Sequence, residues 1–145
     1  MHTSTILEEL APLDQTNFAD EITAGLLTKS AFISPKFLYD PLGSHLFTAI
    51  TLLPEYYPTN TEKSILDQFQ NEIAQVVGRD GVLIDLGAGN CQKAESLFNS
   101  IHPAAYVAID FSEEYLHEAI NKLQGKYPQI QMHALGMDFS SQLLI

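Results

Sequence analysis

Apolar residues recur at every third or fourth position through the first half of the chain, which is the spacing of one face of an α-helix. The pattern predicts three amphipathic helices, over residues 17–30, 42–52 and 59–77. The third is about five turns long. Pro35 and Pro41 stand between the first two helices and favour turns or extended chain there.

The longest predicted helix carries signals at both ends. Thr59 followed by Glu62 is a capping-box pattern, which places the start of the helix at the threonine. Pro54 ends the helix before it, so residues 55–58 are predicted to form a loop. Gly78 is placed to stop the long helix as a C-cap.

From residue 81 onward the period of the pattern changes. Short apolar runs rich in β-branched residues alternate with amphipathic stretches, and such runs are typical of strands buried in a parallel sheet. The predicted elements are strands over residues 82–86, 105–109 and 130–135, a helix over 94–101, and a helix from the N-cap Ser112 to the stop signal Gly125.

The order strand–helix–strand–helix–strand over residues 81–139 predicts an α/β fold. Right-handed crossovers place the three strands side by side and parallel, as part of a Rossmann-like sheet. We divide the chain into a helical, turn-rich segment over residues 1–60 and a Rossmann-like domain over residues 61–145.

Glycine and acidic residues follow the ends of the predicted strands. Ligands in such sheets bind outside the carboxyl ends of the strands, where Gly87–Asn90, Asp110 and Asp138 all stand. Glycines before a helix let the backbone approach a ligand closely, and the free N–H groups of the helix N-terminus attract a phosphate or a carboxylate. A plain tight turn between strand and helix is the alternative.

The acids after the second and third strands fit the two ends of a nucleoside. Asp110 stands 23 residues after Gly87, the position from which an acid accepts hydrogen bonds from ribose hydroxyls; a turn or N-cap aspartate is the alternative. Asp138 could accept from an adenine amino group while Phe139 packs on the base, or the two are an ordinary loop acid and a core ring. Lys93 could pair with a cofactor carboxylate, or it is a solvated surface lysine.

The sixth position of the glycine loop bears on which cofactor is bound. A dinucleotide-binding fingerprint has a third glycine there, which allows close packing of helix and strand. This chain has Gln92 instead, which weakens the case for NAD.

Composition narrows the range of partners. The net charge of −11 repels phosphate backbones and anionic membrane surfaces, so neither nucleic acid nor a membrane is expected as a partner. The single cysteine, Cys91, is expected to be a small buried residue and suits a reducing cytoplasm. No signal peptide, membrane-length apolar run or metal-ligand spacing is evident, so we expect a soluble cytoplasmic protein without a metal site.

Four stretches between residues 31 and 139 together carry a family signature. They are PKFLYDPLGS at 35–44, LPEYYPTNTE at 53–62, the glycine loop Leu86–Gly89 with Lys93, and Gly-Met-Asp-Phe at 136–139. They resemble motifs of the histidine-specific methyltransferases, and the tyrosine-rich stretch is far more specific than a glycine loop. Asn90 and Cys91 depart from the small hydroxyl residues common in that family.

The resemblance implies a class I methyltransferase fold that uses S-adenosylmethionine. The implied substrate is the α-amine of histidine or a related amino acid, as in ergothioneine biosynthesis. Tyr56 is implied to line the substrate pocket, although its neighbour Tyr57 could exchange roles with it, and no catalytic residue can be assigned. The implied cofactor contacts are Tyr39, Gly87, Lys93, Asp110, Asp138 and Phe139.

The resemblance also implies that the chain is the N-terminal portion of such an enzyme, because the family's sheet has seven strands and its substrate domain lies further along the sequence. The first strand then lies beside a missing fourth strand. We expect its edge to be covered by a partner chain, by self-association or by the helices. The chain alone is expected to have weak or no methyltransferase activity.

Two other functions stay open at this point. One is a non-catalytic cofactor-binding or interaction fragment that associates with another chain. The other is an NAD-binding Rossmann domain, against which Gln92 and the tyrosine-rich signature argue.

Overall fold

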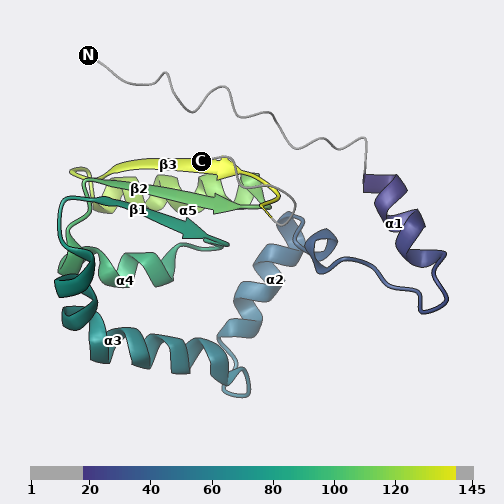
Figure 1. Cartoon of the computed structure of the whole chain (residues 1–145), viewed down its shortest axis with the longest axis horizontal. Coiled ribbons are helices and arrows are strands. Elements are labelled where there is room, and N and C mark those ends of the chain that lie inside the picture. The colour runs from purple at the N-terminus through teal and green to yellow at the C-terminus, as the bar shows by residue number, and fades with distance from the viewer. Residues whose placement is uncertain (1–17, 140–145) are drawn as a thin grey trace, which may run out of the picture. The chain divides into compact units, whose positions relative to one another are not determined.

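The computed structural model describes residues 18–139, which form two compact units (Figure 1). The first unit ends at Phe37 and the second begins at Leu38. The division between domains predicted at residue 60 is a different boundary and stays a prediction.

The first unit contains the helix α1 (Phe18–Leu26), and the short 3-10 helix η2 (Pro35–Leu38) lies where this unit ends. The helix is shorter than predicted, since the hydroxyl and the N–H of Thr28 both bond to the carbonyl of Gly25 and turn the chain. Asn17, the first residue of the predicted helix, lies outside the described residues.

The second unit opens with the helices α2 (Pro41–Thr51) and α3 (Tyr57–Val77). The start of α2 agrees with the prediction to one residue: Asp40 is the N-cap and its side chain accepts a hydrogen bond of 2.7 Å from the Gly43 N–H. The structure corrects the start of α3. The helix begins two residues before Thr59, because Pro58 in the first turn lacks only an N–H that would have no partner there.

The Rossmann-like part of the prediction is confirmed. Three parallel strands stand in the order β1–β2–β3 and are joined by two crossover helices. The last helix runs past the predicted stop at Gly125 and is capped by the Tyr127 N–H on the Leu123 carbonyl. The elements are β1 (Val82–Leu86), α4 (Gln92–Ile101), β2 (Ala105–Asp110), α5 (Glu113–Lys126) and β3 (Gln131–Gly136).

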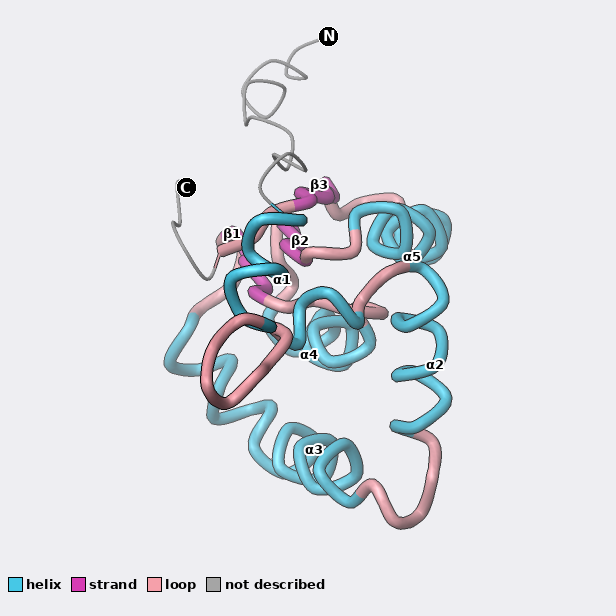
Figure 2. The backbone as a smooth tube through the Cα atoms, turned by 90° about the vertical axis from the view of Figure 1, so that its right-hand side faces the viewer, coloured by secondary structure: helices cyan, strands magenta, loops and turns pink. Residues whose placement is uncertain are grey.

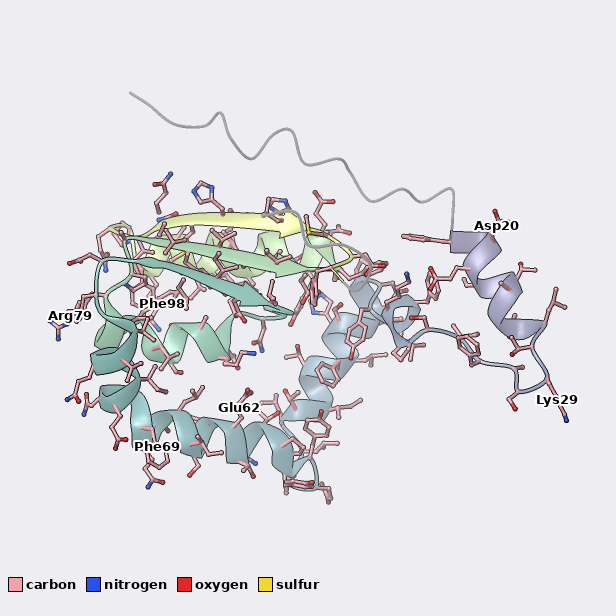
Figure 3. All side chains as sticks on the ribbon, in the orientation of Figure 1. Asp20, Lys29, Glu62, Phe69, Arg79 and Phe98 are labelled. Carbon is pink, nitrogen blue, oxygen red and sulfur yellow. The ribbon has the colours of Figure 1, made fainter. Side chains whose placement is uncertain are left out.

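Both crossover helices lie on the same side of the sheet (Figures 1 and 2), as right-handed crossovers in one direction require. The core forms between these helices and one face of the sheet. Phe98 of α4 is 2% exposed and lies between its helix and the sheet (Figure 3). The buried cluster also includes Ala94, Tyr106, Ala108, Leu116, Ala119, Ile120 and Leu123.

The prediction that the first strand is buried is wrong. Val82, Ile84 and Leu86 alternate along β1 and are 62%, 42% and 44% exposed. Within the described residues β1 lies at an edge of the sheet and pairs only with β2. The crossover helices cover the face that carries Leu83 and Asp85, so the alternate side chains project from the other face.

None of the helices within residues 18–139 is long and apolar enough to cross a membrane.

Candidate functional site

The glycine loop crosses from the end of β1 to the start of α4 and lies against the end of β2. The N–H groups of Gly87 and Ala88 both donate to the Ile109 carbonyl, at 2.8 and 3.1 Å. Gly87 and Gly89 have φ values of +74° and +53°, in the left-handed region that glycine adopts without strain. The predicted turn is therefore a tight loop held at the carboxyl end of the neighbouring strand.

Asp110 ties this loop to the start of the next helix. Its Oδ2 accepts a hydrogen bond of 2.9 Å from the Gly89 N–H, and its Oδ1 accepts one of 3.0 Å from the Ser112 N–H. The residue stands at the predicted strand end, and a ribose role for it stays a prediction. Its bond to the glycine loop was not foreseen, because it depends on how two strands pair.

The end of β3 comes to the same edge of the sheet. The Met137 N–H donates to the Asp110 carbonyl at 2.9 Å, which brings Asp138 and Phe139 beside the end of β2. The Phe139 ring reaches the glycine loop, since its Cζ lies 3.8 Å from the point that a Cβ on Gly87 would occupy. The structure therefore brings the loop and both acidic strand ends together.

Lys93 is partly exposed and makes an ion pair with a buried acid. Its Nζ lies 3.7 Å from Oδ1 of Asp85, whose side chain is 8% exposed, while the lysine side chain is 43% exposed. The other carboxylate oxygen accepts a hydrogen bond of 3.1 Å from the Tyr106 hydroxyl. Sequence reasoning gave Asp85 and Tyr106 no role, although an acid inside an apolar strand was a signal that could have identified the first.

Cys91 is fully buried, as predicted. It takes the left-handed conformation, with φ of +61°, at the N-cap of α4. Burial raises the pKa of its thiol from 9.0 to about 11, so the group is a neutral thiol at physiological pH. Within residues 18–139, no group of three or more His, Cys, Asp or Glu side chains could hold a metal ion.

The two predicted tyrosines of the helical segment meet through a third ring. Phe47 of α2 packs edge-to-face against Tyr39 at 5.7 Å and against Tyr56 at 5.9 Å between ring centroids. Tyr57, the alternative to Tyr56, is 72% exposed, whereas Tyr56 is partly buried, and the pocket role of either tyrosine stays a prediction. The sequence pattern predicts only that Phe47 lies on the apolar face of its helix.

Helix α2 contacts the start of α5, close to the strand ends. The hydroxyls of Thr48 and Tyr115 form a hydrogen bond of 2.5 Å, and the His45 ring packs edge-on against Tyr115 at 4.9 Å. Tyr115 lies in the first turn of α5, five residues after Asp110. Helix α2, on which Phe47 joins the two tyrosines, is thereby held at the end of the sheet where the glycine loop lies.

The parallel strand order, the glycine loop and the acid at the end of β2 define a Rossmann-like α/β domain, a class of sheet in which ligands bind at the carboxyl ends of the strands. Residues 18–144 match the model of a family described as histidine-specific, S-adenosylmethionine-dependent methyltransferases. The chain belongs to this family.

Curated relatives agree with the family match. A histidine N-alpha-methyltransferase of Mycolicibacterium smegmatis is 35% identical over 127 residues, which cover 85% of this chain and 39% of that protein. Ergothioneine biosynthesis protein 1 of Neurospora crassa is 34% identical over 102 residues, 68% of this chain and 12% of that protein. A 4-dimethylallyltryptophan N-methyltransferase of Claviceps purpurea is 25% identical over 113 residues, 75% of this chain and 33% of that protein.

The chain thus spans about two fifths of the length of the Mycolicibacterium smegmatis relative and of a histidine N-alpha-methyltransferase of Mycobacterium tuberculosis, 39% of each. The predicted membership of this family is confirmed, and the roles of individual site residues stay predictions.

Proposed function

We propose that this chain is the S-adenosylmethionine-binding part of an N-methyltransferase that acts on the α-amine of histidine or a related amino acid. One observation carries the proposal: the glycine loop, Asp110 and Phe139 come together at the carboxyl ends of the strands in a chain that belongs to this family. The names of the relatives support the amine as acceptor.

The residues at the strand ends have the chemistry that this cofactor needs. Asp110 would hold the ribose hydroxyls, and Asp138 with Phe139 would hold the adenine ring. A Cβ built on Gly89 would meet nothing within 4 Å, so the loop has open space at that point for a ligand to approach the backbone. The Lys93 ammonium, on the first turn of α4, would face the carboxylate of the methionyl group.

Tyr39 would complete the cofactor site, and Tyr56 would line the pocket of the amino acid. Their shared contact with Phe47 supports this pairing, because a cofactor and an acceptor must lie side by side for methyl transfer.

The bound cofactor supplies an electrophilic methyl group, and the protein supplies position. The residues named above would hold the two reactants in line, which is the main source of rate in such a displacement. The acceptor amine must be neutral to attack. Free α-amines have a pKa of about 8, so only a modest deprotonation is needed at neutral pH. We assign no base for it.

The exposed side of β1 supports a second proposal, that this chain associates with further polypeptide. All-parallel sheets are covered on both faces, yet Val82, Ile84 and Leu86 are each more than 40% exposed. We propose that an additional strand and apolar side chains cover this edge and face, from a longer form of this protein, a partner chain or a second copy. For the chain by itself we expect weak or no methyl transfer, and a clear rate of histidine methylation would refute this.

We also propose a cytoplasmic location. The single buried cysteine and a small amino-acid substrate both suit a reducing compartment that contains S-adenosylmethionine.

Calorimetric titration of the purified chain with S-adenosylmethionine, S-adenosylhomocysteine and NAD tests the cofactor proposal. We expect saturable binding of the two sulfur compounds and none of NAD. The Asp110→Ala variant should lose this binding, because both the ribose contact and the bond to the Gly89 N–H are removed.

The matched control is Asp67→Ala, which removes an acid of the same type on the surface of α3, where Asp67 pairs with Lys63. This variant should bind like the wild type. Absence of binding by the wild-type chain, or binding of NAD alone, would overturn the proposal.

A further inference from the structure

Asp85 is a buried carboxylate in an otherwise apolar strand. It stands on the inward face of β1, and its side chain is 8% exposed, while its strand neighbours are all apolar. Burying a charged group costs free energy unless the charge is paired and hydrogen-bonded. An acid at this place in a strand therefore calls for a role that an apolar residue could not fill.

Each oxygen of this carboxylate has one partner. Oδ2 accepts from the Tyr106 hydroxyl at 3.1 Å, and Oδ1 lies 3.7 Å from the Nζ of Lys93. The tyrosine is fully buried and fixed by the edge-to-face contact of its ring with Phe98. Burial raises the pKa of its hydroxyl far above physiological pH, so this group stays a neutral donor.

Lys93 stands at the border between this buried pair and solvent. Its side chain is 43% exposed, and it lies in the first turn of α4, directly after the glycine loop. At 3.7 Å its contact with Asp85 is longer than a charge-assisted hydrogen bond. The ammonium is therefore held by the field of the carboxylate while its N–H donors remain available to a second anion.

We propose that Asp85 and Tyr106 are positioning residues, which hold the Lys93 ammonium beside the glycine loop so that it meets the carboxylate of the ligand. The inference rests on the proposed function, in which the ligand is S-adenosylmethionine or its product. The tyrosine hydroxyl fixes the Asp85 carboxylate, and the carboxylate in turn restricts the long lysine side chain, which reduces the entropy lost when the ligand binds.

The test compares two ligands that differ in the amino-acid group. S-adenosylhomocysteine carries the carboxylate, whereas methylthioadenosine has the same adenosine and thioether without it. Calorimetric titration of Tyr106→Phe should show an affinity for S-adenosylhomocysteine lowered by about fivefold to tenfold, a difference on the order of 1 kcal/mol, with the affinity for methylthioadenosine unchanged.

Two further variants separate positioning from damage to the fold. Asp85→Asn keeps the shape of the side chain and removes its charge, and it should show the same loss for S-adenosylhomocysteine alone. In a Lys93→Met background, Tyr106→Phe should have no further effect, because the residue through which it acts is gone.

Equal loss of both ligands in Tyr106→Phe and Asp85→Asn, or an undiminished effect in the Lys93→Met background, would overturn the positioning role and leave the proposed function standing. Failure of the wild-type chain to bind either ligand would overturn the proposed function and this inference with it.

Discussion

Replacing Asp110 with asparagine tests the link between the glycine loop and the second crossover helix. In the wild type, each carboxylate oxygen accepts one backbone N–H, from Gly89 and from Ser112. An asparagine has only one oxygen, so its NH2 group must face one of these donors whichever way the amide turns. The backbone N–H that faces this NH2 group loses its acceptor and meets another donor. The other hydrogen bond remains, but its acceptor no longer carries a negative charge.

The expected loss in the free energy of unfolding follows from these two changes. Losing a hydrogen bond to a charged group costs about 1.5–3 kcal/mol, and the half-buried position of the carboxylate lowers this because water can reach part of the site. We therefore expect Asp110→Asn to lower the free energy of unfolding by about 2 kcal/mol. The same variant should bind S-adenosylmethionine more weakly.

Urea denaturation followed by far-ultraviolet circular dichroism measures the change. Asp67→Asn is the control, because its carboxylate pairs with Lys63 on the surface of α3 and such pairs contribute less than about 1 kcal/mol. A free energy of unfolding for Asp110→Asn within about 0.5 kcal/mol of the wild type would refute the argument that this carboxylate holds the loop.

Three other predictions follow from packing and burial. A Cβ on Gly43 would lie 1.7 Å from the Leu38 carbonyl oxygen, so Gly43→Ala should lower the free energy of unfolding in urea by about 2 kcal/mol or more, whereas Gly81→Ala, with nothing within 4 Å, should not. Phe98→Ala should cost about 3–5 kcal/mol in the same assay, because this ring is 2% exposed, and a loss below about 1 kcal/mol would contradict its place in the core. Because the pKa of Cys91 rises from 9.0 to about 11 on folding, the neutral thiol is favoured in the folded state. This preference contributes about 3 kcal/mol to the free energy of unfolding, which is present below pH 9 and is lost as the pH rises from about 9 to 11. Cys91→Ala should remove this part of the alkaline loss, seen as a smaller fall in melting temperature over that range, and identical pH profiles for both proteins would count against it.

Much of the fold could be predicted from local patterns. The ends of the three strands and of both crossover helices were predicted to within one or two residues, including the last helix, which ends one residue past Gly125. Apolar periodicity is a local property, and it distinguishes a strand of five residues from a helix of ten without knowledge of neighbours. Asp110, the acid at the end of β2, was predicted from another local property, its distance along the chain from the glycine loop.

The sequence-based predictions were wrong where two local signals competed, or where the structure depends on residues that are distant along the chain. Thr59 and Glu62 form a capping-box pattern, yet the helix starts earlier because Pro58 is compatible with its first turn. The apolar run of β1 predicted a buried strand, whereas burial depends on what packs on each face, and in the described residues one face carries the crossover helices.

The order of the elements, the strand-end positions of Asp110 and Asp138, and the family signature could all be read from the chain, because each depends on residue type and spacing. Two sets of contacts are visible only in the folded protein: the Asp110 carboxylate holds the glycine loop, and Asp85 is shared by Tyr106 and Lys93. These contacts join residues of different elements, and they form only once the register Leu83–Tyr106 and Asp85–Ala108 sets the two strands side by side. The register depends on which faces of both strands are buried against the crossover helices, so the pattern within one strand alone does not reveal which residues come together.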